Sequence, residues 1–310
     1  MNKSNPLFTN ESKIACIINP KAANLKWKRR RFLRRYLQKN FPGQIIDSHK
    51  DKTFTIETAK KLSSSHDIIV VAGGDGTIAD VIHGIITCGR AKKPAMGIIP
   101  LGSGNGCRKS VKVPRNIFSA VKLIKKGKPR EIDLIKIDGK TACFVSIGAT
   151  GAVTIDKLRN PIHGLFGHLW AAKLMLKYPK KEVDVELIDG IDDSGEQFSQ
   201  KILNLNVFDC IINKTKHFGY SWRVAPLAKI DDGYLDITFF ETKGWVYLLC
   251  FPLIYFGLFQ KTQKHFKAKQ MTIRGKDLAA QYNGEPFGVE DEIKLKVLPR
   301  ALKVISSLNR

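Results

Sequence analysis

The sequence predicts an α/β domain followed by a domain of antiparallel β-strands. Residues 13–127 alternate short apolar runs with helix-like segments, a spacing typical of βαβ units and of a mainly parallel sheet. From about residue 130 onward, short segments rich in Val, Ile, Phe and Thr are divided by DG, NG and SG turn pairs, which indicates antiparallel strands. The pattern changes in the KKGKP segment, residues 125–129. We therefore expect domains over residues 1–128 and 129–310, with the last segment either staying in the second domain or returning to the first.

Three apolar runs of the first domain are expected to be strands that end at polar or glycine-rich loops. The run at residues 14–18 ends at an Asn-Pro pair, the run at 68–71 ends at a glycine run, and the run at 96–99 ends at a second glycine-rich loop. A strongly basic segment, residues 26–39, is expected to be a helix after the first of these strands. In the second domain we expect one helical insertion near residues 165–178 and strands at residues 131–138, 141–147, 182–189, 201–208, 234–240, 270–274 and 292–298.

Charge and cysteine content narrow the class of protein. The formal net charge of +24 favours polyanionic partners, which are nucleic acid, an anionic membrane face or phosphorylated substrates. The six cysteines form no CxxC pair, so no zinc site is indicated. The longest uncharged apolar stretch, residues 245–259, is 15 residues long, whereas a spanning helix needs about 20. Because the first residues also lack the apolar core of a signal peptide, we expect a soluble protein in a reducing compartment.

The first glycine loop, VVAGGDGT, follows a buried strand at the end where ligands bind in open α/β sheets. Its glycines, Gly73, Gly74 and Gly76, let backbone N–H groups approach phosphate oxygens, and a helix starting near Thr77 would direct its positive end at the same anion. Phosphate would repel Asp75 unless a cation or a proton intervened. Asp75 is therefore a candidate for contacting Mg²⁺ or for accepting a substrate proton. The alternative is a tight turn between strand and helix.

The second glycine loop, IIPLGSGNG at residues 98–106, repeats the pattern of an apolar strand followed by interleaved glycines. Serine hydroxyl, asparagine amide and bare backbone could together hold a nucleotide phosphate, with Gly102, Ser103, Gly104 and Asn105 as the candidates. The loop does not fit the GxGxxG fingerprint, and neither loop is a Walker A sequence. The HRD and DFG motifs of protein kinases are also absent.

Five motifs, taken in order, resemble the diacylglycerol kinase catalytic-domain superfamily, which includes bacterial lipid kinases, sphingosine kinases and ceramide kinase. GGDGT alone is shared with NAD kinases and phosphofructokinases, but the ordered combination is specific. The resemblance extends over residues 13 to 308. The motifs are NP at residues 19–20, GGDGT at 73–77, PLGSGN at 100–105, DDGYLD at 231–236 and NGEP at 283–286.

The resemblance implies a fold and an activity. It implies an N-terminal α/β nucleotide-binding domain, a C-terminal antiparallel β-sandwich and an active site in the cleft between them. Members of the superfamily use ATP and Mg²⁺ to phosphorylate a hydroxyl of a membrane lipid, such as diacylglycerol or a sphingoid or ceramide-type lipid. For this chain we therefore expect a cytoplasmic protein that associates peripherally with the anionic inner face of a membrane. A homodimer is left open.

The resemblance also assigns roles to individual residues. Asp75 corresponds to an essential acid near the phosphates, and Glu285 to the glutamate of a DGE motif, so either is a candidate for the catalytic base. Asp133 corresponds to an aspartate near the lipid head group. Asp231, Asp232 and Tyr234 match a loop that holds a structural Mg²⁺ in some bacterial members. The residues expected around the nucleotide are Asn19, Gly73, Gly74, Gly76, Thr77, Asp80, Gly102, Ser103, Gly104 and Asn105.

Several positions depart from the motifs of this superfamily. The usual DGE is NGE at residues 283–285, the usual xNE after GGDGT is IAD at residues 78–80, and the usual NPxSG is NPKAA at residues 19–23. Two alternatives therefore stay open beside a lipid kinase. One is a small-molecule kinase similar to NAD kinases, and the other is a catalytically weak membrane-binding sensor of lipid or nucleotide.

Two segments are candidates for membrane contact. Three interpretations of the basic segment at residues 26–39 are open: a solvated helix face, a site for anionic lipid head groups, or a nucleic-acid site. At an anionic membrane each surface Lys or Arg would add about 1 kcal/mol of binding free energy. Because no RNA- or DNA-binding motif accompanies the charge, we expect no nucleic-acid partner. Residues 245–259 are rich in the aromatic residues of bilayer interfaces. They are either a docking segment, with the following Lys261, Lys264, Lys267 and Lys269 holding head groups, or a buried helix.

Overall fold

The computed structural model describes residues 12–22, 27–49, 51–102, 106–159, 164–217 and 223–307. They form two compact units. The first contains the described residues up to Ile132 and those from Arg300 onward, and the second contains the described residues from Asp133 to Pro299. The chain leaves the first unit within β5 (Lys128–Ile137) and returns to it within β13 (Glu285–Ser306).

The first unit is built on a parallel sheet with the strand order β13-β4-β3-β1-β2. Its strands β1 (Ile14–Ile18), β3 (Ile68–Gly73) and β4 (Ala95–Pro100) are buried at every position. Such continuous burial requires apolar residues on both faces, which is why these segments are unbroken apolar runs. The strand β2 (Gln44–Asp47) lies at the edge and is more exposed.

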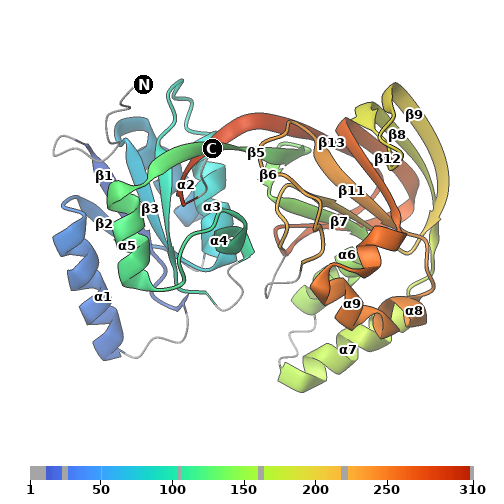
Figure 1. Cartoon of the computed structure of the whole chain (residues 1–310). Helices are drawn as coiled ribbons and strands as arrows, with labels where there is room; N and C mark the ends of the chain where they lie inside the picture. The colour runs from blue at the N-terminus through green and yellow to red at the C-terminus, as the bar shows by residue number, and fades with distance from the viewer. Residues whose placement is uncertain are drawn as a thin grey trace. The chain divides into compact units, whose positions relative to one another are not determined.

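Helices cover both faces of this sheet (Figure 1). On one face, α1 (Trp27–Asn40) and α5 (Ile117–Lys126) share an apolar core with β1 and β3. On the other, α2 (Lys52–Ser65) packs against α3 (Asp75–Ile86) so closely that a Cβ on Gly84 would lie 2.5 Å from the Cβ of Ala59. The short α4 (Gly106–Ser110) follows the second glycine loop.

The second unit consists mainly of antiparallel strands. Four of them close into a ring, because β12 (Lys264–Tyr282) pairs with both β7 (Phe144–Gly148) and β11 (Leu235–Phe240), and these two both pair with β10 (Asp209–Asn213). The strand β8 (Lys181–Ile191) pairs with β12, and β9 (Gln197–Val207) pairs with β8, whereas β6 (Lys140–Ala142) pairs with β5. Side chains from most of these strands, together with β5 and β13, form a single large apolar core.

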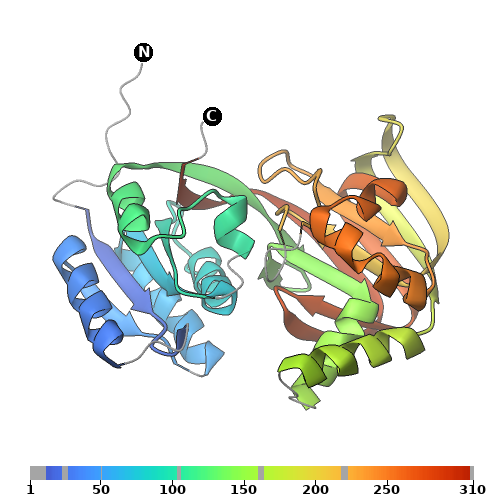
Figure 2. The same ribbon diagram turned by 60° about the horizontal axis from the view of Figure 1, so that its bottom comes forward.

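Short helices gather at one end of the second unit (Figures 1 and 2). They are α6 (Ala149–Arg159), α7 (Gly164–Lys177), α8 (Gly244–Leu249) and α9 (Phe251–Phe256), followed by the 3₁₀ turn η2 (Phe259–Thr262). The stretch expected to be one apolar segment at 245–259 is therefore two short helices. Within the described part of the chain, no helix is long and apolar enough to cross a bilayer.

Candidate functional site

A pocket of about 430 Å³ lies in the first unit, where β1, β2 and β3 end and α2 and α3 begin. This is the edge of a parallel sheet at which ligands usually bind, because several loops and helix starts converge there. The pocket is lined by Asn19, Pro20, Lys21, Ser48, His49, Lys52, Thr55, Gly76, Thr77 and Asp80.

Asn19 joins the end of β1 to the start of α3. Its side-chain Nδ2 donates to Thr77 Oγ1 at 2.9 Å, its Oδ1 accepts from the backbone N–H of Lys21 at 2.9 Å, and its own N–H donates to the Ala72 carbonyl at 2.8 Å. Four of the ten predicted nucleotide contacts line this pocket: Asn19, Gly76, Thr77 and Asp80. Asn19 and Thr77 hold each other in position.

The two glycine loops touch each other. A Cβ on Gly74 would lie 3.2 Å from the Cα of Gly102, and a Cβ on Gly73 would lie 2.7 Å from the Cβ of Thr77. A larger residue at either position would push the loops or the start of α3 apart. Gly76 has open space around its missing side chain and faces the pocket. The predicted residues Ser103, Gly104 and Asn105 lie outside the described residues.

Asp75 connects the first glycine loop to the helix after the second. Its carboxylate accepts hydrogen bonds from the backbone N–H groups of Gly106 at 3.1 Å and Cys107 at 3.3 Å, at the start of α4. Backbone N–H groups at a helix start have no partner within the helix, so a carboxylate there is stabilising. In this structure the half-buried Asp75 therefore fixes the two loops relative to each other.

The pocket combines positive charge with the start of a helix. Lys21 and Lys52 line it together with His49, while Asp80 is the acidic residue among the lining side chains. The N-terminus of α3 adds a partial positive charge at Gly76 and Thr77. Such a set favours a ligand with phosphate groups. The contributions of Ser48, His49, Lys52 and Thr55 were missed in the sequence, because the short strand β2 before them was not predicted.

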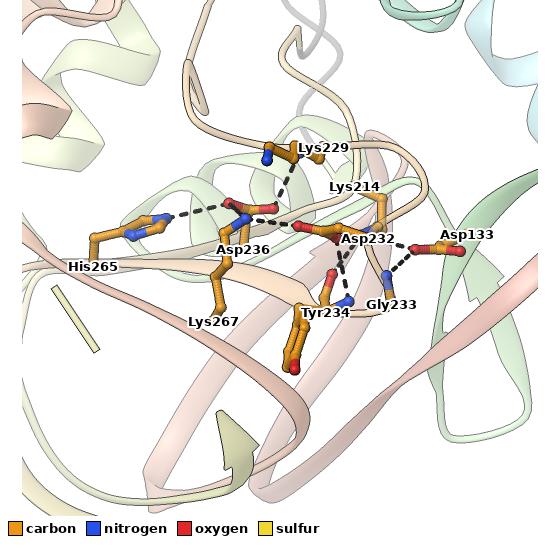
Figure 3. Close-up of polar contacts among 9 residues, drawn as sticks. All are labelled: Asp133, Lys214, Lys229, Asp232, Gly233, Tyr234, Asp236, His265 and Lys267. Atoms are coloured by element: carbon orange, nitrogen blue, oxygen red, sulfur yellow. Dashed lines mark hydrogen bonds and ion pairs between the residues drawn. The ribbon is translucent and has the colours of Figure 1, made fainter. Parts of the chain in front are cut away.

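A second cluster of charged residues lies in the second unit (Figure 3). At its centre is Lys214, whose ammonium group is 3.2 Å from Asp133 Oδ2 and donates to Asp232 Oδ1 at 2.7 Å and to the carbonyl of Tyr234. The side chains of Lys214 and Asp133 are each only 1% exposed. A lysine this deeply buried needs such partners, because an unpaired buried charge is strongly destabilising.

Lys267 and His265 complete the cluster from β12. Lys267 donates to Asp232 Oδ2 at 2.6 Å and lies 4.0 Å from Asp236 Oδ1, which is also 3.3 Å from His265 Nε2. Burial alone would raise the pKa of Asp232, but the hydrogen bonds from Lys214 and Lys267 outweigh it and the pKa lies below its ordinary value. Asp232 is therefore a carboxylate held between two ammonium groups.

The loop predicted to hold a metal does not fit one. Both oxygens of Asp232 and the carbonyl of Tyr234 accept hydrogen bonds from lysines, and the described residues contain no group of three or more His, Cys, Asp or Glu side chains that could hold a metal ion. The prediction for Asp231, Asp232 and Tyr234 rested on the loop alone. The competing cations, Lys214 and Lys267, come from positions 18 and 35 residues away in the sequence.

Asp133 and Glu285 come from two strands of the second unit, β5 and β13. Asp133 Oδ2 accepts from the backbone N–H of Gly233 at 2.7 Å in addition to its contact with Lys214, so it holds the 231–234 loop. A contact between Asp133 and a lipid head group stays a prediction. Glu285 is partly buried at the start of β13, directly after a turn in which Asn283 and Gly284 have positive φ.

The substitution of Asn283 for the usual aspartate has a structural explanation. Its Oδ1 accepts from the backbone N–H of Cys143 at 2.8 Å, and its Nδ2 donates to the Thr141 carbonyl at 3.2 Å. A carboxylate could accept the first hydrogen bond but could not donate the second. Asparagine also tolerates the positive φ of 51° at this position.

Comparisons with known proteins cover both units. Residues 13–137 match the family described as the diacylglycerol kinase catalytic domain, and residues 118–306 match the family described as the YegS C-terminal NAD kinase beta sandwich-like domain. The second match alone covers more than half of the chain. The expectation of two domains, the second a β-sandwich, is confirmed.

Named relatives and solved structures agree with these matches. The chain is 27% identical over 192 residues to a diacylglycerol kinase of Staphylococcus saprophyticus, covering 60% of this chain and 58% of that protein. It is 28% identical over 203 residues to one of Staphylococcus carnosus, covering 64% and 61%. The match thus spans about three fifths of these relatives. The crystal structure of a diacylglycerol kinase from Bacillus anthracis has the same fold, with a TM-score of 0.71 at 22% identity over 97% of this chain and 99% of that one.

Proposed function

Because the chain belongs to the family of proteins with a diacylglycerol kinase catalytic domain, we propose that it is an ATP-dependent lipid kinase. It would transfer the γ-phosphate of ATP to a hydroxyl of a membrane lipid such as diacylglycerol or a sphingoid or ceramide-type lipid. The observation that carries this proposal is the pocket at the ends of β1, β2 and β3, where two lysines and the start of α3 surround Asn19 and Thr77.

This pocket suits a nucleotide in size and in charge. A volume of about 430 Å³ lies within the range of ligand pockets. Lys21 and Lys52 would neutralise phosphate oxygens, and the backbone N–H groups of Gly76 and Thr77 would donate to them. Mg²⁺ bound to the nucleotide would neutralise further phosphate charge, with the carboxylate of Asp80 in the pocket and that of Asp75 nearby as the groups of this chain that could hold it.

Phosphoryl transfer asks little covalent chemistry of the protein. It needs the donor and acceptor to be positioned, the charge to be stabilised and one group to take the hydroxyl proton. The candidates for the base are the carboxylates of Asp75 and Glu285. The hydrogen bonds from Gly106 and Cys107 would hold Asp75 in one orientation. Such preorganisation is what a general base requires.

If the acceptor is a membrane lipid, the reaction must take place at a membrane surface. The lipid stays in the bilayer, so the protein would act as a peripheral protein on the anionic cytoplasmic face of a membrane. The large positive charge supports this proposal, because it draws the protein to an anionic surface. Nucleic acid is not proposed as a partner.

A second candidate has an observation of its own. The matched second-domain family carries NAD kinase in its description, so a kinase acting on a nucleotide acceptor is the competing proposal. The two candidates differ in where the phosphate goes. Purified protein is incubated with Mg-ATP labelled in the γ-phosphate, a lipid extract and NAD, and the organic and aqueous phases are separated. Label in the organic phase supports the lipid kinase, label on NAD supports the alternative, and label on neither contradicts both.

A further inference from the structure

The exposed apolar side chains of this protein are concentrated in a few elements. Of the 14 large hydrophobic side chains that are exposed in the described part of the chain, eight belong to α7, α8, α9 and the residue two positions after α9. Scattered single exposures are ordinary, but a concentration of this kind marks a contact surface. The eight are Leu169, Leu176, Trp245, Leu249, Leu253, Tyr255, Phe256 and Leu258.

These side chains belong to adjacent helices that each bury one side. Gly244, the first residue of α8, approaches α7 so closely that a Cβ would lie 2.7 Å from the Met175 carbonyl oxygen. Met175, Tyr247 and Ile254 point inward and share an apolar core beneath the helices. Figure 2 shows α7, α8 and α9 at the same end of the second unit. The exposed residues therefore form the outward side of this layer, here called the helical face.

The three helices of the helical face contain no acidic residue, and Asp156 of α6 contacts α7 by accepting from Trp170 Nε1 at 2.7 Å. The sequence has no Asp or Glu at residues 157–181, which include α7, or at residues 242–276, which include α8 and α9. The helices α8 and α9 contain no charged residue of either sign. Exposed cations lie on or beside the same elements: Lys173 and Lys177 on α7, Lys243 directly before α8, and Arg223, whose backbone N–H donates to the Tyr255 carbonyl at 3.2 Å.

The lysines expected to assist this segment have other partners. Lys264 pairs with Glu241 at 2.8 Å, Lys267 with Asp232 at 2.6 Å and Lys269 with Asp189 at 3.4 Å. A contact between these lysines and head groups stays a prediction. Lys261 lies among the residues whose side chains are not described. The positive charge beside the helical face comes from α7 and from Lys243 instead.

We propose that the helical face docks on a bilayer that contains anionic lipid. This inference rests on the proposed lipid kinase function and identifies the surface through which the enzyme would reach its substrate. Two helices of six residues each cannot cross a bilayer, but they can lie in its interfacial plane with Leu249 and Phe256 among the acyl chains. The aromatic Trp245 and Tyr255 suit the head-group level, and Lys177 and Lys243 would contact anionic head groups.

Vesicle flotation with the full chain tests this proposal. Binding to phosphatidylcholine vesicles is compared with binding to vesicles that also contain phosphatidylglycerol. The variant Leu249→Ser/Phe256→Ser removes two side chains that are 72% and 63% exposed, and it should lower the partition coefficient by at least about tenfold. The control Ile202→Ser/Val289→Ser removes side chains that are 72% and 50% exposed on strands of the same unit, and it should bind as the wild type does.

The charge contribution is tested separately. Lys177→Glu/Lys243→Glu should lower the partition coefficient on the anionic vesicles by at least about fivefold per lysine. The difference from the wild type should become smaller as ionic strength rises. Binding to vesicles of phosphatidylcholine alone should change little. All variants concern exposed side chains, so their melting temperatures should stay within about 2 °C of the wild type.

Three outcomes would overturn the proposal. The first is wild-type protein that fails to float with anionic vesicles, and the second is a Leu249/Phe256 variant that floats like the control. The third is a wild-type dimer that this variant converts to a monomer with vesicle binding unchanged, which would make the helical face an interface between two copies. None of these readouts depends on catalysis. If the kinase proposal alone fails, flotation is unaffected, and if docking alone fails, phosphorylation of a short-chain diacylglycerol in detergent persists.

Discussion

Replacing Lys214 by Met is the substitution for which the structure gives the clearest magnitude. The ammonium group of Lys214 is buried to 1% exposure and touches the carboxylates of Asp133 and Asp232 and the carbonyl of Tyr234. Met fills a similar volume but leaves Asp133 buried without its cation. Removing one partner of a buried ion pair typically costs about 3–5 kcal/mol, so we expect the free energy of unfolding of the second unit to fall by about that amount.

The assay is urea unfolding followed by tryptophan fluorescence, because three of the four tryptophans, at positions 170, 222 and 245, belong to the second part of the sequence. Lys269→Met is the matched control. Lys269 pairs with Asp189 at 3.4 Å, but both side chains are 51% exposed, so its removal should cost no more than about 1 kcal/mol. The double variant Lys214→Met/Asp133→Asn should recover part of the loss, since the buried carboxylate is neutralised. A Lys214→Met protein as stable as the Lys269→Met control would refute this interpretation of the cluster.

Three further predictions concern metal, pH and catalysis. Because Lys214 and Lys267 supply the positive charge around Asp232, neither EDTA nor Mg²⁺ should move the melting temperature of the second unit in calorimetry without nucleotide, and a rise with Mg²⁺ would contradict this. Burial raises the pKa of Asp209 to about 7 in the folded protein, although hydrogen bonds from Thr150 and Tyr247 oppose this increase. The preference of the folded protein for protonated Asp209 therefore contributes its full stabilisation below about pH 4, and this contribution is lost as pH rises through about 7. In the wild type this lowers the free energy of unfolding by about 4 kcal/mol between pH 4 and pH 7, and Asp209→Asn should abolish this pH dependence. A variant that keeps the wild-type pH profile would contradict the prediction. Asp75→Asn should lower turnover about 10²-fold or more in a phosphotransfer assay while the protein stays folded by circular dichroism, and a fully active, folded variant would exclude Asp75 from the chemistry.

Much of the first unit follows from local sequence, because its central strands are buried on both faces. The runs that became β1, β3 and β4 had to be continuously apolar, so the pattern identified them. The strand β2 was missed, since it is four residues long and partly exposed. The strand β10 was also missed, because it begins two residues after the end of β9 and no glycine-containing turn motif separates the two strands.

The long strands of the second unit were recognised only in part. The expected strands at 270–274 and 292–298 are pieces of β12 and β13, which run for 19 and 22 residues. Local alternation fades where these strands change partners or bulge, as between Arg274 and Leu278. The expected boundary after residue 128 lies at the start of β5, which runs on into the second unit. A strand that belongs to two units has no local signal of the boundary.

The candidate site shows the same division between local and distant information. The glycine run pointed to Gly73 and Gly74, because a loop that brings its backbone N–H groups close to an anion needs consecutive small residues. Thr77 was indicated by its place at the expected start of the next helix. No local pattern could show that Lys214 and Lys267 would occupy the oxygens of Asp232, since the three positions meet only in the folded chain.

The central claim is tested most directly by transfer of the γ-phosphate to a lipid. Wild-type protein is incubated with anionic vesicles that contain diacylglycerol and with Mg-ATP labelled either in the γ- or in the α-phosphate. We predict label in the organic phase from γ-labelled ATP only. We also predict a loss of this label when Lys52, which lines the pocket, is replaced by Ala, but not when the exposed Lys92 is replaced. Equal transfer by the Lys52 variant would contradict the assignment of this pocket to ATP. The absence of label from every hydroxylated lipid offered to the wild type would contradict the lipid kinase itself.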